Sequence, residues 1–175
     1  MNVGDKTADG APSVSGVVVF GIGTQANNGL GGATVLALDN AGYVETAFPA
    51  GATQHASYLD SGSNALFFLD TATTKIPQCA GIQNSFYCPA AAVSLAATIS
   101  QGSTTSAKFA FSVANADQLA ARNFAFNNFA GPMQGYPDST LPSFDWGLPF
   151  FFGRLVYSAI ETRTTPSGSG PYFAF

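Results

Sequence analysis

One short segment contains residues whose types and spacing could do chemistry. Residues 58–63 read Tyr-Leu-Asp-Ser-Gly-Ser, and a second apolar stretch follows them. An apolar strand would deliver the Asp60 carboxylate into a tight turn, and Gly62 would let a ligand or another backbone approach closely. The hydroxyls of Ser61 and Ser63 could hydrogen-bond that carboxylate and the nearby main chain. The alternative is an ordinary turn of a β-hairpin, because Asp, Ser and Gly are common turn residues.

Other chemical arrangements in the sequence are weaker. Asp145 or Glu161 could pair with Asp60 as the two carboxylates of a glycosidase, although solvated side chains are the alternative. His55 lies five positions before Asp60 and is better interpreted as a surface loop residue. The Gly-Ile-Gly at 21–23 lacks the third glycine and the following helix of a dinucleotide site. The chain also has no phosphate-binding loop and no Gly-x-Ser-x-Gly elbow, so no cofactor is expected.

Cys79 and Cys88 are the only cysteines, and they lie nine positions apart. A metal site would need more ligands, and the chain has a single histidine, so no bound metal is expected. A short-loop disulfide is the favoured interpretation and indicates an oxidising compartment. Two free buried thiols are the alternative.

The composition excludes several classes of protein. The chain has 175 residues, a net charge of −4 and only 9% charged residues, with six Lys and Arg spread along it. No basic patch for nucleic acid or anionic membrane can form from so few cations. No apolar run reaches the length of about 18 residues that a transmembrane helix needs. The hydrophobic content of 46% argues against a disordered chain.

The elements that must position these residues are predicted to be short strands with little helix. Residues 34–39 and 43–48 are expected to form a hairpin, and residues 70–106 and 130–143 are expected to be mainly loops. Asn115 resembles an N-cap with Gln118 three positions later, which predicts a short helix at 116–122. The predicted strands are Val17–Phe20, Thr34–Asp39, Tyr43–Phe48, Ser57–Leu59, Ala65–Leu69, Lys108–Val113, Phe124–Phe129 and Tyr172–Phe175. We expect a loosely ordered leader at 1–15 and one β-rich domain at 16–175.

The segment around Asp60 resembles the active-site turn of the pepsin-like aspartic proteases, which reads apolar-apolar-Asp-Thr/Ser-Gly-Thr/Ser. Further segments agree in the order of the C-terminal lobe of such an enzyme. They are the opening strand at 16–21, the cysteine pair where that lobe has a disulfide, the alternating strand at 108–113, the apolar-apolar-Gly turn with Trp146 and Gly147, the closing strand at 154–161 and the last strand at 170–174. The resemblance implies an all-β, pepsin-like acid protease lobe of double-ψ architecture over residues 16–175.

A closer resemblance is to a bacterial secreted family of unknown function, in segments 21–25, 59–64 and 146–154. Longer chains of that family have an upstream lobe with its own Asp-Thr-Gly turn. This chain therefore resembles an excised C-terminal lobe of a secreted or periplasmic protein, without its signal peptide. The partner implied is the missing N-terminal lobe or a second copy of the chain, with no nucleic acid and no membrane span.

The resemblance implies a role for each residue of the turn. Asp60 would supply one half of a pair of aspartates, Ser61 would help to fix the turn, Gly62 would permit close approach and Ser63 would orient the carboxylate. The isolated lobe is expected to be inactive, because a second carboxylate must come from another lobe. The alternatives are a non-catalytic binding module for a peptide or polysaccharide, and a homodimeric protease of the retroviral type. Asp145 departs from the family pattern by occupying an apolar position, which puts a charge near the site.

Overall fold

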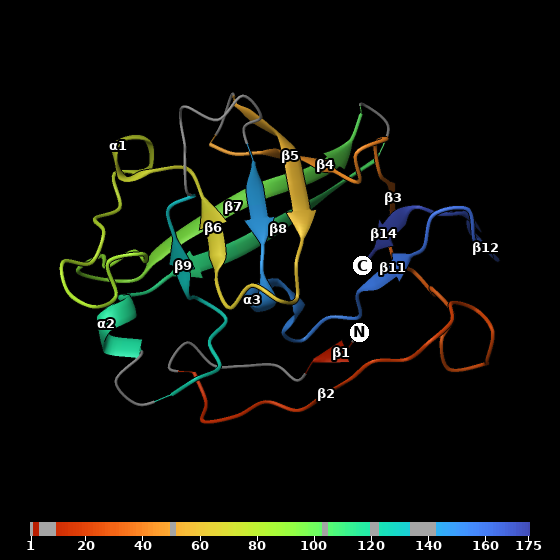
Figure 1. Cartoon of the computed structure of the whole chain (residues 1–175), viewed down its shortest axis with the longest axis horizontal. Coiled ribbons are helices and arrows are strands. Elements are labelled where there is room, and N and C mark those ends of the chain that lie inside the picture. The colour runs from red at the N-terminus through yellow and green to blue at the C-terminus, as the bar shows by residue number, and fades with distance from the viewer. Residues whose placement is uncertain (1, 4–9, 50–51, 103–104, 120–122, 134–142) are drawn as a thin grey trace.

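Seven of the fourteen strands that the structure describes belong to a single curled sheet (Figure 1). The computed structural model describes residues 2–3, 10–49, 52–102, 105–119, 123–133 and 143–175. Seven strands form the sheet in the order β8-β7-β4-β5-β10-β6-β9. They are β4 (Val44–Ala47), β5 (Thr53–Leu59), β6 (Leu66–Phe68), β7 (Val93–Gln101), β8 (Thr105–Val113), β9 (Ala130–Gly131) and β10 (Phe144–Trp146).

Three smaller sheets and three one-turn helices complete the described chain. A three-stranded sheet has the order β11-β14-β3, and two pairs join β1 with β2 and β12 with β13. These strands are β1 (Asn2–Val3), β2 (Gly16–Val17), β3 (Val35–Ala37), β11 (Tyr157–Ala159), β12 (Thr164–Thr165), β13 (Gly168–Ser169) and β14 (Tyr172–Ala174). The helices are α1 (Thr71–Thr74), α2 (Ala116–Leu119) and α3 (Leu148–Phe151). Among the described helices, none is long and apolar enough to span a bilayer.

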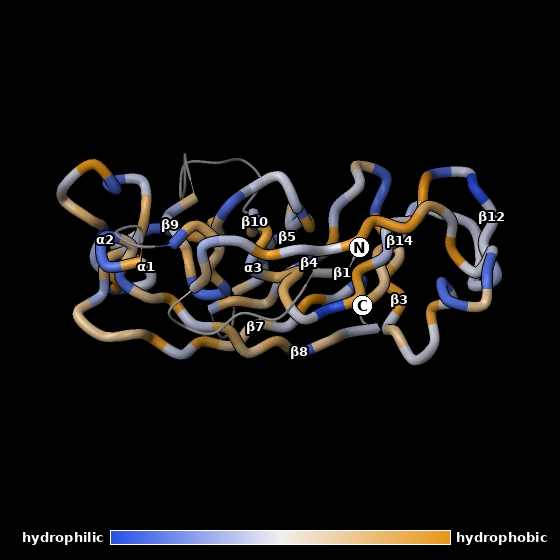
Figure 2. The backbone as a smooth tube through the Cα atoms, turned by 90° about the horizontal axis from the view of Figure 1, so that it is seen from below, coloured by the Kyte–Doolittle hydropathy of each residue, from blue (hydrophilic) through white to orange (hydrophobic). Residues whose placement is uncertain are grey.

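The sheet curls because a long hairpin crosses over its other strands. β7 and β8 pair antiparallel over nine residues each, and they form one layer of the molecule (Figure 2). The strands β5, β10 and β9 lie on the opposite side, with α3 between the two layers (Figure 2). The fold is therefore mostly β-sheet with a few short helices, arranged as a curled half-barrel.

Aromatic side chains fill the space inside the curled sheet. Phe144 stacks on Trp146 with ring centroids 4.3 Å apart and on Phe68 at 4.9 Å. Phe111 of β8 meets the edges of these rings, and Phe150 of α3 packs against Trp146. Burying such rings removes a large apolar area from water and is the main stabilising term of a fold this poor in charge.

Several predicted elements are confirmed by the structure. β3, β4, β6 and β14 lie within segments predicted as strands, and β8 includes the predicted strand at 108–113 but begins at Thr105. Phe109, Phe111 and Val113 point to the core at the predicted period of two. The Asn115 side chain accepts a hydrogen bond from the Gln118 amide (3.2 Å), as an N-cap does. The helix is assigned to Ala116–Leu119, and residues 120–122 lie outside the described part.

Other predictions about the elements are wrong. The Asp39 turn forms, with its side chain accepting the Tyr43 amide at 2.8 Å, but β3 and β4 then diverge into different sheets instead of pairing. Residues 70–106 contain the long strand β7, whose Ser and Ala residues conceal its alternation. Residues 130–143 begin with the two-residue strand β9, and 134–142 lie outside the described part. Residues 124–129 contain only an isolated bridge at Ala125.

The predicted strand at 17–20 is also wrong in its burial. Only Val17 of that run is in a strand, and Val18 and Phe20 are 63% and 91% exposed. A short apolar run is typical of a buried strand, whereas in this chain the run lies on the surface. The expected leader at 1–15 contains the short strand β1, which pairs with β2.

Candidate functional site

Asp60 lies in a turn that holds its carboxylate in a fixed position. The turn joins the end of β5 to the start of β6. The Gly62 amide donates to Asp60 Oδ1 (2.8 Å), and the Ser63 hydroxyl donates to Asp60 Oδ2 (2.9 Å). Asp60 is half-buried, so its carboxylate is oriented by the turn and still reaches the surface.

Strand β10 runs between β5 and β6 and contacts the backbone of the Asp60 turn. It is parallel to β5, with Asp145 opposite Tyr58, and antiparallel to β6, with Asp145 opposite Phe67. The Asp60 amide donates to the carbonyl oxygen of Trp146 (3.1 Å). The turn is therefore connected by main-chain hydrogen bonds to a strand about 85 residues away in the sequence.

Gly147 ends β10 directly against the backbone of the Asp60 turn. A Cβ atom at this position would lie 1.9 Å from the carbonyl oxygen of Ala65 and 2.9 Å from that of Ser63. The next amide, that of Leu148, donates to the Ser63 carbonyl oxygen (2.7 Å). Only glycine permits this close approach, so Gly147 and Trp146, both expected in a supporting turn, do lie next to the Asp60 turn.

Asp145 is a second carboxyl group at the site, and it is almost completely buried. Its side chain is 4% exposed, whereas its neighbours Phe144 and Trp146 point into the aromatic core on the other face of β10. The Asp145 pKa is raised to about 6, mainly by burial and also by the negative charge of Asp60, while an interaction with the Ser63 hydroxyl acts to lower it. Among the described residues, Asp145 Oδ1 has no hydrogen-bond partner.

Tyr58 is a third titratable group beside the two carboxyl groups. Tyr58 lies beside Asp145 on β5, and its pKa is raised by burial and by the charges of Asp145 and Asp60. Among the residues that the structure describes, no Lys or Arg forms an ion pair with Asp60 or Asp145, and the His55–Glu45 pair lies elsewhere.

A hollow with apolar walls lies directly beside the Asp60 turn. It has a volume of about 410 Å³, and Leu59 and Ser61, the two neighbours of Asp60, line it. Its rim is formed by what we call the exposed apolar face, made of Val17, Val18, Val19, Phe20, Leu155 and Ile160, whose exposures range from 53% to 91%. Large contiguous apolar surfaces of this kind usually contact another protein or a ligand.

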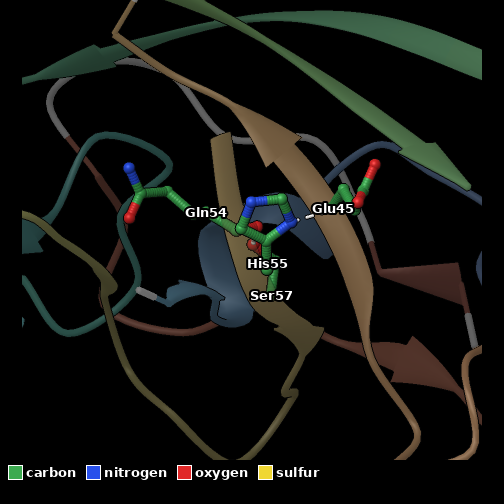
Figure 3. Close-up of polar contacts among 4 residues, drawn as sticks. All are labelled: Glu45, Gln54, His55 and Ser57. Atoms are coloured by element: carbon green, nitrogen blue, oxygen red, sulfur yellow. Dashed lines mark hydrogen bonds and ion pairs between the residues drawn. The ribbon is translucent and has the colours of Figure 1, made fainter. Parts of the chain in front are cut away.

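His55 takes no part in this site (Figure 3). It is an exposed residue of β5, not of a loop, and its Nδ1 atom lies 3.1 Å from Glu45 Oε1. The neighbouring Gln54 points away from that pair and donates to the Phe48 carbonyl oxygen at 3.0 Å (Figure 3). Five positions along an extended strand place His55 roughly 16 Å from Asp60.

The alternative of a glycosidase-like carboxylate pair does not fit the geometry. Asp145 does lie beside the Asp60 turn, but its burial prevents contact with a sugar ring. Glu161 is exposed and forms an isolated backbone bridge with Gly170. The alternative of a solvated side chain is also wrong for Asp145, which is 4% exposed on the central strand β10.

Cys79 and Cys88 form a disulfide, as expected from their count and spacing, with Cα atoms 4.8 Å apart. Both sulfur atoms lie near the Asp117 carboxylate. Since the sulfur atoms are bonded to each other, this grouping offers no thiolate to a metal ion. The bridge closes the loop that precedes β7.

The position of Asp145 beside the Asp60 turn does not follow from the sequence pattern. Asp145 departs from the apolar pattern of its segment, but its proximity to Asp60 and Ser63 depends on the register of β10 between β5 and β6. The signal available in the sequence was a single charged residue between two large aromatic residues, Phe144 and Trp146.

No curated protein and no solved structure matches this chain. A family model described as a protein of unknown function (DUF3443) matches residues 1–175. The match covers the Asp60 turn, β10 and the disulfide, and the chain belongs to this family.

Proposed function

We propose that this chain is one lobe of an aspartic-peptidase-like protein, in which Asp60 supplies one of two catalytic carboxylates. The observation that carries the proposal is the Asp60 carboxylate, held by Gly62 and Ser63 at the surface beside a hollow. The position of β10 between β5 and β6 also supports the proposal. The resemblance implies that an apolar-apolar-Gly turn, here with Trp146 and Gly147, belongs to the frame of the active site, and these two residues lie next to the Asp60 turn. The pepsin-like double-ψ architecture is part of this proposal.

The chemistry explains why one lobe is not sufficient. Two carboxyl groups that share a proton and a water cannot both ionise, so one stays charged and takes a proton from the water while the other stays protonated. In this chain Gly62 and Ser63 would hold Asp60 in the required orientation, Ser61 would contact whatever enters the hollow, and Leu59 would line it. The second surface carboxylate has to come from another lobe.

The exposed apolar face supports a second lobe as the partner. It surrounds the hollow beside Asp60, so a body that covered it would also bring its own residues to the Asp60 carboxylate. Burial of side chains such as Phe20 and Ile160 would contribute about 25 cal/mol per Å² of apolar area. A second copy of the chain is the alternative partner, as in a homodimeric protease.

The disulfide supports a location in an oxidising compartment. Disulfides are rare in the reducing cytosol of most organisms and persist in secreted and periplasmic proteins. We infer that the protein acts outside the cytoplasm, where a short bridge between Cys79 and Cys88 remains oxidised.

The test is proteolysis by the natural protein that contains this chain, beside the chain alone. Denatured casein is incubated with each form between about pH 3 and pH 7, the range in which carboxylate pairs operate. We expect cleavage by the natural protein, loss of cleavage in Asp60→Asn, and none by the chain alone. Asp117→Asn, which changes an exposed carboxylate away from the site, is the matched control.

Two other outcomes would redirect the proposal. Cleavage by the chain alone, together with a dimer in light scattering, would identify a homodimeric protease. Absence of cleavage by folded natural protein would overturn catalysis and leave a binding module built on the same sheet, whose hollow should then be screened with peptides and oligosaccharides.

A further inference from the structure

A second hollow, which we call the inner hollow, lies between the β7–β8 hairpin and α3. It has a volume of about 360 Å³, and Figure 2 shows α3 between the two layers of the molecule. Phe150 of α3 lines the inner hollow, whereas the next residue, Phe151, lines the hollow beside Asp60. The two hollows share no described lining residue, so a ligand of the inner hollow is independent of the function proposed for Asp60.

The walls of the inner hollow are mainly aromatic. The rings that line it come from β8, β10 and α3, and they are Phe109, Phe111, Trp146 and Phe150. The Trp146 ring lies 5.4 Å from the Phe150 ring and 5.6 Å from the Phe111 ring, measured between centroids. Aromatic rings attract further rings through edge-to-face and offset contacts. Small-molecule sites have volumes of about 300 to 1,000 Å³. The inner hollow therefore favours a small ligand with an aromatic ring.

Arg154 places a positive charge at the inner hollow. Among the described lining residues, it is the one charged side chain. Its guanidinium carbon lies 5.3 Å from the centre of the Phe109 ring and 5.0 Å from the centre of the Phe150 ring. Its Nη1 atom donates a hydrogen bond to the Phe150 carbonyl oxygen. The two rings and this hydrogen bond hold the guanidinium in a defined position.

The chemistry of this guanidinium selects an anion. A guanidinium has five N–H donors, so it can bind several acceptors at once, and it stays protonated in proteins. Its planar fork matches the two oxygens of a carboxylate. The chain as a whole has a net charge of −4 and only six Lys and Arg, but no acid is among the described lining residues of the inner hollow. The charge at this hollow is therefore opposite to that of the chain, and it complements a carboxylate.

We propose that the inner hollow binds a small aromatic carboxylate, with the ring of the ligand against Trp146 and Phe150 and its carboxylate at Arg154. Arg154 is half-buried and Trp146 is 1% exposed, so the charged end of the ligand lies at the mouth of the hollow and the ring lies deeper. The ligand does not have to order a flexible arginine, because two rings already hold that side chain, and this lowers the entropic cost of binding.

The test is a titration of the full chain with hydrocinnamate at neutral pH, followed by the fluorescence of Trp146, the single tryptophan. We expect saturable binding with a dissociation constant between about 10 µM and 1 mM for so small a ligand. Hydrocinnamide has the same ring without the charge and should bind about ten- to a hundred-fold more weakly, because a charged hydrogen bond is lost. Arg154→Gln should weaken hydrocinnamate binding by the same factor and leave the affinity for the amide nearly unchanged. Arg163→Gln, at an exposed arginine outside the hollow, is the matched control and should bind both compounds like the wild type.

Amide chemical shifts of the ¹⁵N-labelled chain locate the bound hydrocinnamate. The amides of Ala110, Phe111 and Arg154 should shift on saturation, and those of Val18 and Phe20 in the exposed apolar face should not. Absence of saturable binding below about 10 mM, or shifts confined to the exposed apolar face, would overturn the inference. Equal affinities for the acid and the amide would overturn the recognition of a carboxylate by Arg154. If Arg154→Gln does not fold, the comparison of acid with amide and the shift map still decide the outcome, because both use the wild-type chain.

Discussion

The amide of Asp60 donates a hydrogen bond to the carbonyl oxygen of Trp146 at 3.1 Å. This contact connects the turn between β5 and β6 to the strand that runs between them. The Trp146 side chain lies in the aromatic core, and Asp145, the preceding residue, points to the other face beside Asp60. The orientation of the candidate site is therefore coupled to the packing of the core, and the first two predictions below test this coupling.

Gly147→Ala should destabilise the fold and disturb the Asp60 turn. The added Cβ would lie 1.9 Å from the Ala65 carbonyl oxygen, so a backbone segment has to move. We expect a loss on the order of 3 kcal/mol in the free energy of unfolding, measured by urea denaturation. Gly32→Ala, where a Cβ meets nothing within 4 Å, is the control. Equal stability of the two variants would contradict the close approach at Gly147.

Thr46→Val should weaken the core without changing its shape. The Trp146 Nε1 group donates to Thr46 Oγ1 (2.9 Å), and both residues are almost fully buried. Removing the acceptor leaves a buried N–H group unsatisfied, which costs about 2 kcal/mol. Trp146 is the single tryptophan, so its fluorescence during urea denaturation reports this loss directly. The control is Thr164→Val at an exposed position, which should have the stability of the wild type. An equal loss of stability in that control would contradict the role of the Trp146–Thr46 hydrogen bond.

The stability of the fold should decrease with rising pH because of Asp145. Its pKa rises from 3.8 to about 6 on folding, so the folded state binds more protons than the unfolded state between these values. The contribution is fully present below about pH 4 and is lost as the pH rises through 6, on the order of 3 kcal/mol in total. The difference in unfolding free energy between wild type and Asp145→Asn isolates it from other carboxyl groups. A difference that does not change with pH would contradict the burial of this acid.

Reduction of the Cys79–Cys88 disulfide should lower the stability by about 3 kcal/mol, because the bridge restricts a short loop of the unfolded chain. The measurement is the urea midpoint with and without a reductant. The double variant Cys79→Ser/Cys88→Ser should have the lower midpoint in both conditions. If alkylation shows that the thiols are free and the urea midpoint of the wild type is still unchanged, the disulfide does not contribute to stability and other contacts hold the loop.

Local patterns predicted much of what lies near the site. The Asp60 turn followed from the types of residues 58–63, and the inward face of β8 followed from alternation at Phe109, Phe111 and Val113. The long strand β7 was not predicted, because its small and polar residues do not alternate clearly. The turn at Asp39 was predicted but the pairing of its strands was not, since β3 finds its partner in β14, near the other end of the chain.

The sequence by itself determined the β-rich class, the disulfide and the segment that presents a carboxylate in a turn. These depend on composition and on residues that are close together in the chain, where periodicity and turn chemistry act directly. The tertiary structure alone decided that Asp145 is buried beside Asp60 and that residues 17–20 are exposed. The burial of Asp145 depends on the pairing of distant strands, because β10 lies between β5 and β6 and this register sets the face to which Asp145 points. The exposure of residues 17–20 depends on which other segments of the chain pack against them, and a local run of apolar residues does not specify that.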